Sequence, residues 1–430
     1  MKSSSALPAF LFSCTRSTLH AITVNGWTYI FPGIGPEILI CTYGRRTTAD
    51  RVMASDGLCD IAFYDSIYAD GRNILGDNRF GSDLVTFMGA VARYRKTKLG
   101  VAFAFRHIDQ LGNDLRRTNP NPLQVFWQRR IYHTGVLDTP PNATRSQMMI
   151  AMSRIMILDR FAQSQRALNR RALTALSLHL QPGSGYTSLT TSSSEYRFSS
   201  KRQWTTYVVS GRLEFIPDLL VVYGHYPFGD NTVDNCVVMP PTRLSAVPLA
   251  VELRGSYSYD MSHGPVGAGE WERRQLPTLP LVSVTMKGRW TRASQGQPLQ
   301  FFSRCEKNPI AASFGSYTQV CRGTNYGPNL RYQPQHYAML TYDAKNRTLF
   351  AYDNEAGLAA KLCKVKDTAL DVTFGIAAYD VDYDDYANDC GMRNKFGKHS
   401  RLKALRNVKD YYRSLASKIF NEARCTKVVS

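Results

Sequence analysis

The sequence predicts an α/β protein whose eight parallel strands close into a (β/α)8 barrel. Short apolar runs alternate with helix-length segments eight times between residues 37 and 412, which is the pattern of a parallel barrel. The run Phe374–Tyr379 is apolar, with Gly375 near its start, as in a strand buried on both faces. Four carboxylates follow that run, those of Asp380, Asp382, Asp384 and Asp385. The active face of such a barrel lies at the carboxyl ends of its strands, although an acidic loop after any core strand would give the same local pattern.

The first four strands and the helices between them follow from apolar runs and helical periodicity. The expected strands are Glu37–Gly44, Cys59–Asp65, Leu99–Phe105 and Ile131–Pro141, the last placed by its position in the chain. The expected helices are Ser82–Tyr94, Pro122–Arg130 and Ser146–Gln165. Apolar residues of the third helix, many of them Met, recur at helical spacing, which indicates core packing.

The second half of the barrel is predicted in the same way. Its strands are Leu173–Leu180, Asp218–Gly224, Leu281–Arg289 and Phe374–Tyr379, and its last helices are Ala356–Val365 and Ser400–Ala423. Residues 184–200 are rich in Ser, Thr and Tyr and are expected to form an exposed loop, and residues 292–335 read as a loop-rich insertion between strands 7 and 8. We therefore expect a leader segment over 1–36, the barrel over 37–412, and the end of the last helix with a tail over 413–430.

One further apolar segment before Tyr259-Asp260 could also be a barrel strand. It is interrupted by Arg254 and Gly255, and only about 20 residues separate it from the next strand, which leaves little room for a helix. We prefer Asp260 as the N-cap of a short sixth helix.

Composition limits the classes of function. The 430 residues are 43% hydrophobic, enough for a large core, and no stretch approaches the 18 consecutive apolar residues of a membrane span. The formal net charge of +19 favours anionic partners such as an anionic polysaccharide. Because no zinc-finger or RNA-binding motif is present, we expect a generally basic surface and no specific nucleic-acid partner.

Cysteine and sequon patterns indicate a secreted glycoprotein. None of the nine Cys forms a Cys-x-x-Cys pair, and no His-x-x-x-His pair or Gly-rich phosphate loop occurs, so we expect neither a metal site nor a cofactor. Asn-x-Thr sequons at Asn142 and Asn346 predict glycosylation, and both features suit an oxidising compartment. The apolar run Ala6–Cys14 is short for a signal peptide, so residues 1–36 read as a weak or incomplete leader.

The C-terminal part of the chain resembles glycoside hydrolase family 18, the chitinase family. Tyr352-Asp353 precedes the last barrel helix, and Gly375, Asp380 and Asp384-Asp385 follow the family's eighth-strand pattern, with Tyr379 where that pattern has Trp. The resemblance covers about residues 37–412 and is strongest in the last 70. Four segments together also resemble a divergent chitinase-like group from ticks: Gly57–Asp60, Gly224–Pro227, Val282–Trp290 and residues 374–385.

The resemblance implies covalent and architectural features. In the family, a Cys in strand 1 commonly bonds a Cys entering strand 2, and Cys41 and Cys59 match these places, which neighbouring parallel strands bring within disulfide reach. A small subdomain often lies between strands 7 and 8, where this chain has residues 292–335. We also expect a bond among Cys305, Cys321, Cys363 and Cys390, with the pairing open.

The resemblance also identifies a missing catalytic acid. The family's strand 4 motif, Asp-x-x-Asp-x-Asp-x-Glu, ends in the general acid, whereas Gly135–Pro141 holds Asp138 and no Glu. Loss of a general acid typically costs 10²–10⁴-fold in rate. Asp138 and Asp380 are weak candidates for replacement acids, and Asp138 could equally cap the strand or the helix after it.

Two functions follow. The first is a secreted, catalytically inactive chitinase-like protein that binds chitin or N-acetylglucosamine-type glycans, or a protein partner, through the degenerate barrel cleft. Aromatic rings at strand ends would then stack on sugars, or else they fill the core: Tyr64, Phe105, Tyr223, Trp290 and Tyr379. The second is a divergent family 18 glycosidase that uses relocated acids such as Asp138 with Asp380.

Overall fold

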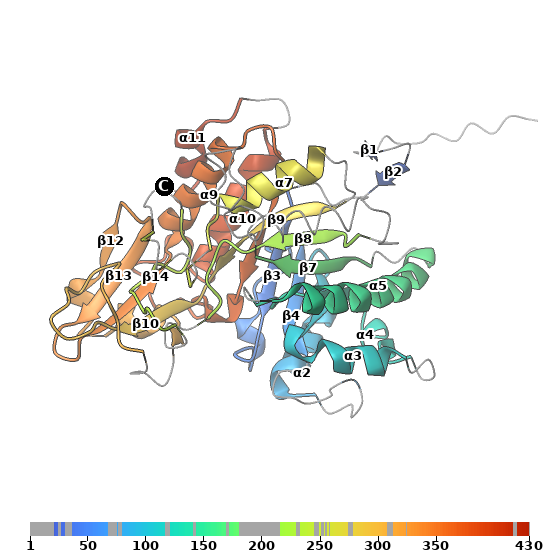
Figure 1. Cartoon of the computed structure of the whole chain (residues 1–430), viewed down its shortest axis with the longest axis horizontal. Helices are drawn as coiled ribbons and strands as arrows, with labels where there is room; N and C mark the ends of the chain where they lie inside the picture. The colour runs from blue at the N-terminus through green and yellow to red at the C-terminus, as the bar shows by residue number, and fades with distance from the viewer. Residues whose placement is uncertain are drawn as a thin grey trace, which may run out of the picture.

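The structure, a computed structural model, resolves a barrel and an inserted sheet (Figure 1). It describes residues 37–67, 80–116, 121–140, 143–168, 172–179, 216–228, 233–244, 259–273, 278–307, 313–323, 325–415 and 419–429, with isolated residues between these ranges and the backbone of two strands before them. Those two strands, β1 (Ala21–Val24) and β2 (Trp27–Ile30), pair with each other and belong to neither larger sheet.

Eight parallel strands form a closed barrel in the order β15-β3-β4-β5-β6-β7-β8-β9, which confirms the predicted fold class. The strands are β3 (Leu39–Tyr43), β4 (Ile61–Ile67), β5 (Lys98–Phe103), β6 (Ile131–Val136), β7 (Thr174–Leu178), β8 (Leu219–Val222), β9 (Leu279–Thr285) and β15 (Gly375–Tyr379). The last strand closes the barrel by pairing with the first, Ile376 opposite Leu39. Gly375 permits this approach, because a Cβ there would lie 2.6 Å from the carbonyl oxygen of Ile38.

Alternation along each strand separates the barrel interior from the layer beneath the helices. On β4, Ile61 and Phe63 belong to the interior cluster, whereas Ala62 and Tyr64 belong to the cluster between barrel and helices. By this alternation Asp65 continues the interior row at the carboxyl end of the strand. Polar residues at such positions open onto the mouth of the barrel.

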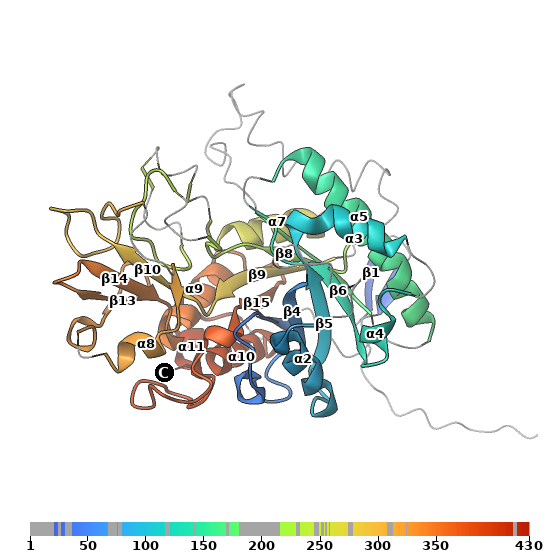
Figure 2. The same ribbon diagram turned by 90° about the horizontal axis from the view of Figure 1, so that it is seen from below.

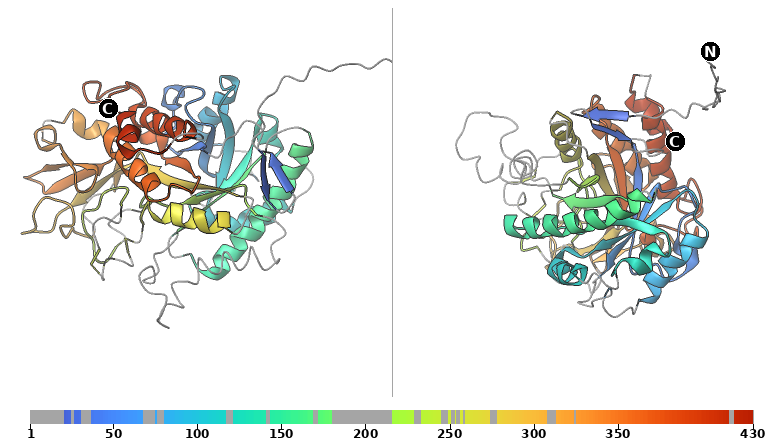
Figure 3. Two further views of the ribbon diagram at one scale, coloured as in Figure 1. Left: turned by 90° about the horizontal axis from the view of Figure 1, so that it is seen from above. Right: turned by 90° about the vertical axis from the view of Figure 1, so that its right-hand side faces the viewer.

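Helices cover the outside of the barrel (Figures 2 and 3). They are α2 (Ser82–Gly89), α3 (Ile108–Leu115), α4 (Gln124–Trp127), α5 (Arg145–Ala167), α7 (His263–Arg273), α9 (Glu355–Asp367), α10 (Ser400–Arg413) and α11 (Glu422–Lys427). The long helix α5 begins with a capping box in which the Thr144 hydroxyl accepts from the Gln147 N–H. None of the helices in the described part of the chain combines the length and hydropathy of a membrane span.

The segment at Tyr259-Asp260 is not a strand, and it leads into α7. Asp260 lies three residues before that helix, so it does not occupy the N-cap position expected for it. Its Oδ1 accepts from the N–H of Ser262 at 2.9 Å, and its Oδ2 lies 3.2 Å from Nη2 of Arg243. Asp260 therefore stabilises the buried turn that precedes the helix.

The insertion between the seventh and eighth strands contains its own sheet, which projects to one side of the barrel (Figure 1). The sheet is antiparallel, in the order β11-β10-β14-β13-β12. Its elements are β10 (Gly288–Arg292), β11 (Phe314–Gly315), α8 (Thr318–Cys321), β12 (Arg331–Gln333), β13 (Ala338–Asp343) and β14 (Thr348–Tyr352). The insertion is thus longer than the expected 292–335, since it also takes in Gly288-Arg289 and the segment before Asp353.

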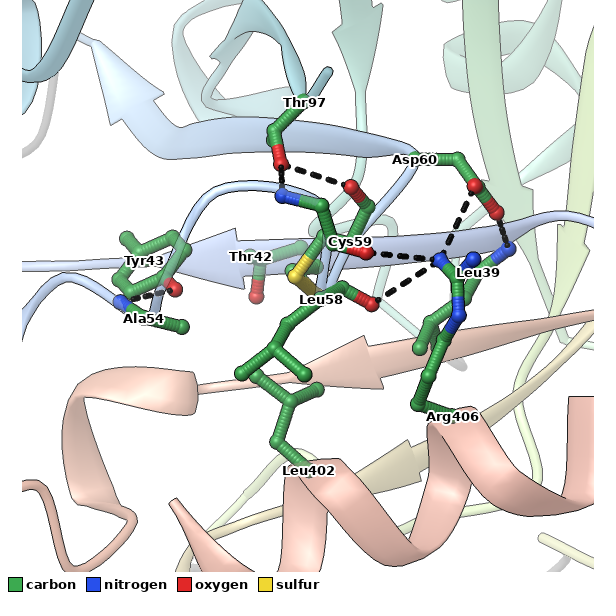
Figure 4. Close-up of a disulfide and its surroundings, with 12 residues drawn as sticks. Leu39, Thr42, Tyr43, Ala54, Leu58, Cys59, Asp60, Thr97, Leu402 and Arg406 are labelled. Atoms are coloured by element: carbon green, nitrogen blue, oxygen red, sulfur yellow. Dashed lines mark hydrogen bonds and ion pairs between the residues drawn. A yellow bond between two sulfur atoms is a disulfide. The ribbon is translucent and has the colours of Figure 1, made fainter. Parts of the chain in front are cut away.

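Four disulfides link segments of the described chain. The expected bond between Cys41 and Cys59 joins β3 to the residues that enter β4, and Arg406 of α10 donates to Asp60 beside it (Figure 4). Cys321–Cys390 joins the insertion to the loop after β15, and it is one of the pairings left open among four Cys. The other two of those Cys pair outside that set, in Cys236–Cys305 and Cys363–Cys425. The last bond ties α11 to α9, so the region after residue 413 includes a fastened helix.

Candidate site at the mouth of the barrel

The mouth of the barrel gathers polar side chains from the ends of several strands. Asp65 lies near the carboxyl end of β4, Asp138 follows β6, His179 follows β7, His225 follows β8, and Asp380 follows β15. Parallel strands in a closed barrel place their carboxyl ends on one face. The side chains therefore share one region although they are far apart in sequence.

Asp138 and Asp380, the two acids identified from the sequence, are both engaged. The Asp138 Oδ1 accepts from the N–H of Phe105 at 2.7 Å, and burial raises the pKa of Asp138 to about 6. The Asp380 Oδ1 lies 2.7 Å from Nζ of Lys287, and its Oδ2 accepts from the Thr285 hydroxyl at 2.8 Å. The Asp380 carboxylate is therefore held as the partner of an ammonium group.

Asp65 is a third acid that the sequence analysis did not select. Its pKa is raised well above the ordinary range, first by burial and then by the neighbouring charge of Asp138. Its Oδ1 is buried without a hydrogen-bond partner. The sequence contains a signal for it, because Asp65 closes the expected strand Cys59–Asp65 much as Asp380 follows the apolar run Phe374–Tyr379.

Asp382 contributes a fourth carboxyl group. Its side chain is 2% exposed, and its Oδ2 accepts from the N–H of Arg46 at 3.0 Å, while its Oδ1 has no partner. Burial, followed by the charge of Asp380, raises the pKa of Asp382 to about 6. Asp382 therefore brings a carboxyl group that can gain or lose a proton near neutral pH.

The remaining two carboxylates after β15 have structural partners. Asp384 pairs with Arg401 of α10 at 2.9 Å. Asp385 accepts from the N–H groups of Asp389 and Cys390 and from Nδ2 of Asn394, each at 2.8 Å. These two acids hold the loop after β15 in place.

Four rings fill the centre of the mouth. The ring of His179 stacks on Tyr223 with centroids 4.1 Å apart, and the rings of His225 and Tyr379 lie 4.6 Å apart. Burial lowers the pKa of both histidines to about 3, so both are neutral at physiological pH. The Tyr223 hydroxyl donates to the carbonyl of Leu137.

The rings proposed as stacking platforms fall in three places. Tyr223 and Tyr379 lie at the mouth, but they are only 2% and 4% exposed. Tyr64 and Phe105 pack between barrel and helices, where the Tyr64 hydroxyl donates to Asp83 at 2.7 Å. Trp290 is half-buried on the inserted sheet, against Phe350 and Tyr326. The structure thus brings together Tyr223 and Tyr379 with the acids, and it places the rings of the other three outside the mouth.

Several buried polar atoms at the mouth lack a hydrogen-bond partner. Besides the Oδ1 atoms of Asp65 and Asp382, the buried atoms without a hydrogen-bond partner include Thr139 Oγ1, His179 Nε2 and Tyr379 Oη. Buried polar groups are nearly always paired, and one left unpaired costs about 1–3 kcal/mol. Five such atoms at the ends of four strands mark a place suited to a hydrogen-bonding ligand or ordered water.

The acids of the mouth are not arranged as a metal centre. Within the described ranges, no set of three or more His, Cys, Asp or Glu side chains is placed to hold a metal ion. The carboxyl groups, rings and hydroxyl groups at the mouth can form hydrogen bonds, pair with charges and exchange protons.

Comparison with known proteins relates the fold to chitinases. No family model matches the sequence, and no curated protein matches it. Solved structures match over most of their lengths. An immunomodulatory active chitinase from Trichuris suis is 12% identical, with a TM-score of 0.60 and coverage of 86% of this chain and 99% of that one.

Two further structures agree with that match. A Group IV chitinase from Ostrinia furnacalis is 14% identical, with a TM-score of 0.59 and coverage of 87% of this chain and 100% of that one. A GH18 chitinase from Cycas revoluta in complex with (GlcNAc)3 is 10% identical, with a TM-score of 0.55 and coverage of 86% and 99%. The chain therefore has the (β/α)8 barrel fold of glycoside hydrolase family 18 chitinases.

Proposed function

We propose that this protein is a secreted, chitinase-like glycan-binding protein that does not hydrolyse chitin at an enzyme-like rate. The observation that carries glycan binding is the set of unpaired polar atoms at the mouth, which includes Tyr379 Oη, Thr139 Oγ1 and His179 Nε2. Sugar hydroxyl groups both donate and accept, so they can satisfy such a mixed set. A chitinase of the same fold is known in complex with (GlcNAc)3, which favours an oligosaccharide over other polar ligands.

We infer the lack of hydrolysis from the residues that follow β6. Asp138 is followed by Thr139 and Pro140, so no second carboxyl group follows it where the family's general acid would stand. Its own carboxylate accepts from the N–H of Phe105. Protonation of a poor leaving group needs a positioned acid, whereas binding needs none.

Secretion and a relationship to the tick-type chitinase-like group are parts of the same proposal. Four disulfides suit an oxidising compartment. The assignment to a tick-type chitinase-like group rests on the four sequence segments alone. A protein partner remains the competing ligand for the same mouth, and an anionic polysaccharide remains the competing glycan on account of the net charge.

A divergent glycosidase is the second candidate, and one observation favours it. Burial raises the pKa of both Asp65 and Asp138, and the charge of Asp138 raises that of Asp65 further. A protonated acid beside an ionised one is what proton transfer to a leaving oxygen requires. The relocated pair would then be Asp65 with Asp138, because Asp380 is already paired with Lys287.

The test compares binding with turnover on the same purified, disulfide-intact chain. Chito-oligosaccharides are titrated by calorimetry, and product is measured over about pH 3–8, the range in which carboxyl groups titrate. We expect saturable binding without turnover. Turnover abolished by Asp138→Asn or Asp65→Asn would establish the second candidate, and absence of binding to any glycan would overturn the first.

Tyr379→Phe sharpens the test, because it removes only the unpaired hydroxyl. The variant should fold with unchanged or slightly higher stability, since no hydrogen bond is lost. Its affinity for the glycan should fall by about 1 kcal/mol, the usual worth of one hydrogen bond. Unchanged affinity would show that the hydroxyl does not face the ligand. Trp290→Ala is the matched change at a ring outside the mouth, and it should leave binding at the mouth unchanged.

A further inference from the structure

We propose that the protein binds linear sulfated polysaccharides on the face of the barrel opposite the mouth. The site is a basic surface made of five exposed cations: Arg95, Lys96, Lys98, Arg129 and Arg130. The first three lie at the start of β5, and the other two immediately precede β6. The mouth lies at the carboxyl ends of the strands, whereas this basic surface lies at their amino ends. The proposal is therefore separate from the glycan binding proposed for the mouth.

The two segments of the basic surface lie side by side. Strands β5 and β6 pair in parallel with Leu99 opposite Ile131, and neighbouring strands are about 4.8 Å apart. Lys98 and Arg130 each precede one of these two partners. Arg130 also reaches the other segment, because its Nη2 donates to the carbonyl oxygen of Val91 at 3.2 Å. The fold thus gathers cations from two separate parts of the sequence at neighbouring strand ends.

The loop before β5, residues 93–98, is held from its inner side. The Asp56 carboxylate accepts from the N–H groups of Arg95, Lys96 and Thr97 at distances between 2.8 and 3.1 Å. The Thr97 hydroxyl donates to the carbonyl of Cys59 at 2.8 Å (Figure 4). These bonds fix the backbone while the basic side chains remain exposed. A loop that is already ordered loses less conformational entropy when it binds a ligand.

The charge of the basic surface is not cancelled by the acids around it. Within the described ranges, none of its five side chains forms an ion pair. Asp50 lies nearby but pairs with Arg93 at 2.8 Å. Asp60, at the entry to β4, pairs with Arg406 at 3.2 Å. Asp56 remains as one carboxylate against five cations, and its oxygens already accept from backbone N–H groups.

A sulfated polysaccharide fits this surface better than other polyanions do. Guanidinium groups form paired hydrogen bonds with oxyanions, and ammonium groups add point charges. Single-stranded nucleic acid would stack its bases on exposed rings, and a membrane surface would take up exposed apolar side chains. Within these two segments no aromatic or large apolar side chain is exposed, since Tyr94 is half-buried and its hydroxyl donates to Ala54. Four disulfides also suit an extracellular setting, where sulfated polysaccharides occur.

Arg130 allows binding to be separated from folding. Its backbone is in the left-handed region, with φ 58°, where a side chain is strained and glycine is not. Arg130→Gly therefore removes a cation of the basic surface and relaxes the backbone at the same time. We expect its melting temperature to stay at or above that of the wild type, while its affinity for the polysaccharide falls.

The experiment uses the full disulfide-bonded chain and a heparin octasaccharide, titrated by calorimetry over a range of salt concentrations. We expect saturable binding at about 0.15 M salt that weakens steeply as salt rises, because binding releases counterions. The triple variant Arg95→Gln, Lys96→Gln, Lys98→Gln should bind about tenfold more weakly or worse, and the slope of log affinity against log salt should shrink by about one for each cation removed. Arg130→Gly should bind about threefold more weakly.

The matched control changes the same residue types on another part of the molecule. Arg393→Gln, Lys395→Gln, Lys398→Gln removes one arginine and two lysines that are exposed in the loop after β15. This variant has the same net charge as the first triple variant and should bind the octasaccharide nearly as the wild type does. The same octasaccharide without its sulfate groups, a DNA duplex and phosphatidylserine vesicles serve as ligand controls, and each should bind more weakly.

Several outcomes would overturn the proposal. Equal losses in the two triple variants would show that overall charge drives binding and would reject the site, as would unchanged affinity in Arg130→Gly. Equal binding of the desulfated octasaccharide, or tighter binding of DNA or vesicles, would reject a sulfated polysaccharide as the partner. Titration with (GlcNAc)4 reports on the mouth and should be unchanged in every variant, so the two proposals fail or succeed separately. Melting temperatures confirm folding, and Arg130→Gly remains decisive if the triple variant does not fold.

Discussion

Arg401 and Asp384 form an ion pair inside the protein, with Nε and Oδ1 2.9 Å apart and both side chains at most 1% exposed. The guanidinium also donates to three backbone carbonyls, those of Met286, Tyr383 and Asp353. One side chain of α10 thus binds the segment after β9, the loop after β15, and the residue between β14 and α9. The barrel and its insertion meet at this arginine.

Arg401→Ala should therefore be strongly destabilising. It leaves the Asp384 carboxylate buried without its counter-charge, which typically costs about 3–5 kcal/mol. Arg322→Ala breaks a similar pair with Asp389 at the surface, where the two side chains are 64% and 42% exposed, and should cost less than about 1 kcal/mol. Urea unfolding of the two variants measures both free energies, and equal losses would contradict the assigned role of Arg401.

Removal of the Cys41–Cys59 bond should lower stability even though it spans few residues. A closed loop of this size constrains the unfolded chain by about 3 kcal/mol. The double change Cys41→Ser with Cys59→Ser should lower the free energy of unfolding by about that amount. The pair Cys363 and Cys425, 62 residues apart, should contribute about 4 kcal/mol. Peptide mapping without reductant that found Cys41 and Cys59 as free thiols would contradict the pairing itself.

Asp382→Asn should stabilise the protein at neutral pH. Folding raises the pKa of this carboxyl group from 3.8 to about 6. The folded state therefore binds more protons, and the stability that the group provides is complete below about pH 3.8 and is lost as pH rises through 6. At pH 7.5 the ionised group costs about 3 kcal/mol relative to acid conditions, and the amide carries no such cost.

Thermal unfolding of Asp382→Asn at pH 7.5 and pH 4 measures this effect. We expect a higher melting temperature than wild type at pH 7.5 and little difference at pH 4. Asp384→Asn is the matched control, because its carboxylate is paired with Arg401, and it should destabilise at pH 7.5. A loss of stability in Asp382→Asn at pH 7.5 would mean that its carboxylate has a stabilising partner besides the N–H of Arg46.

Asn346 should carry a glycan when the protein is secreted from a eukaryotic cell. It lies exposed in the turn between β13 and β14, where its Nδ2 donates to Asp343 at 2.8 Å. Intact mass before and after amidase treatment detects the glycan, and Thr348→Ala should abolish it by breaking the sequon. The other predicted sequon, at Asn142, lies outside the described residues.

The barrel could be predicted from sequence because its signals are local. Runs such as Phe374–Tyr379 are apolar along their whole length and end in polar residues, which identifies both a strand and its open end. The inserted sheet was harder, because its strands are short and pair across long separations, as Trp290 does with Phe350. Such strands draw their stability from cross-strand contacts that no local pattern contains.

The acids at the mouth were only partly predictable. Asp138 and Asp380 were selected from a family pattern, whereas Asp65 emerged from the alternation of β4 and its neighbours in space. The four carboxylates after β15 looked alike in sequence, yet Asp384 and Asp385 are held by α10 and by the loop itself. Each role depends on a partner that lies elsewhere in the fold. The local sequence around an acid does not identify that partner.

The pairing of β15 with β3 has a consequence for biosynthesis. The first barrel strand meets its last partner only after residue 379 has left the ribosome, so the nascent chain carries two open sheet edges until then. Such edges invite pairing with other chains, and long-range parallel pairing is slow to form. We expect the emerging protein to depend on chaperones throughout synthesis, and chains that stop before Gly375 to aggregate as they are released.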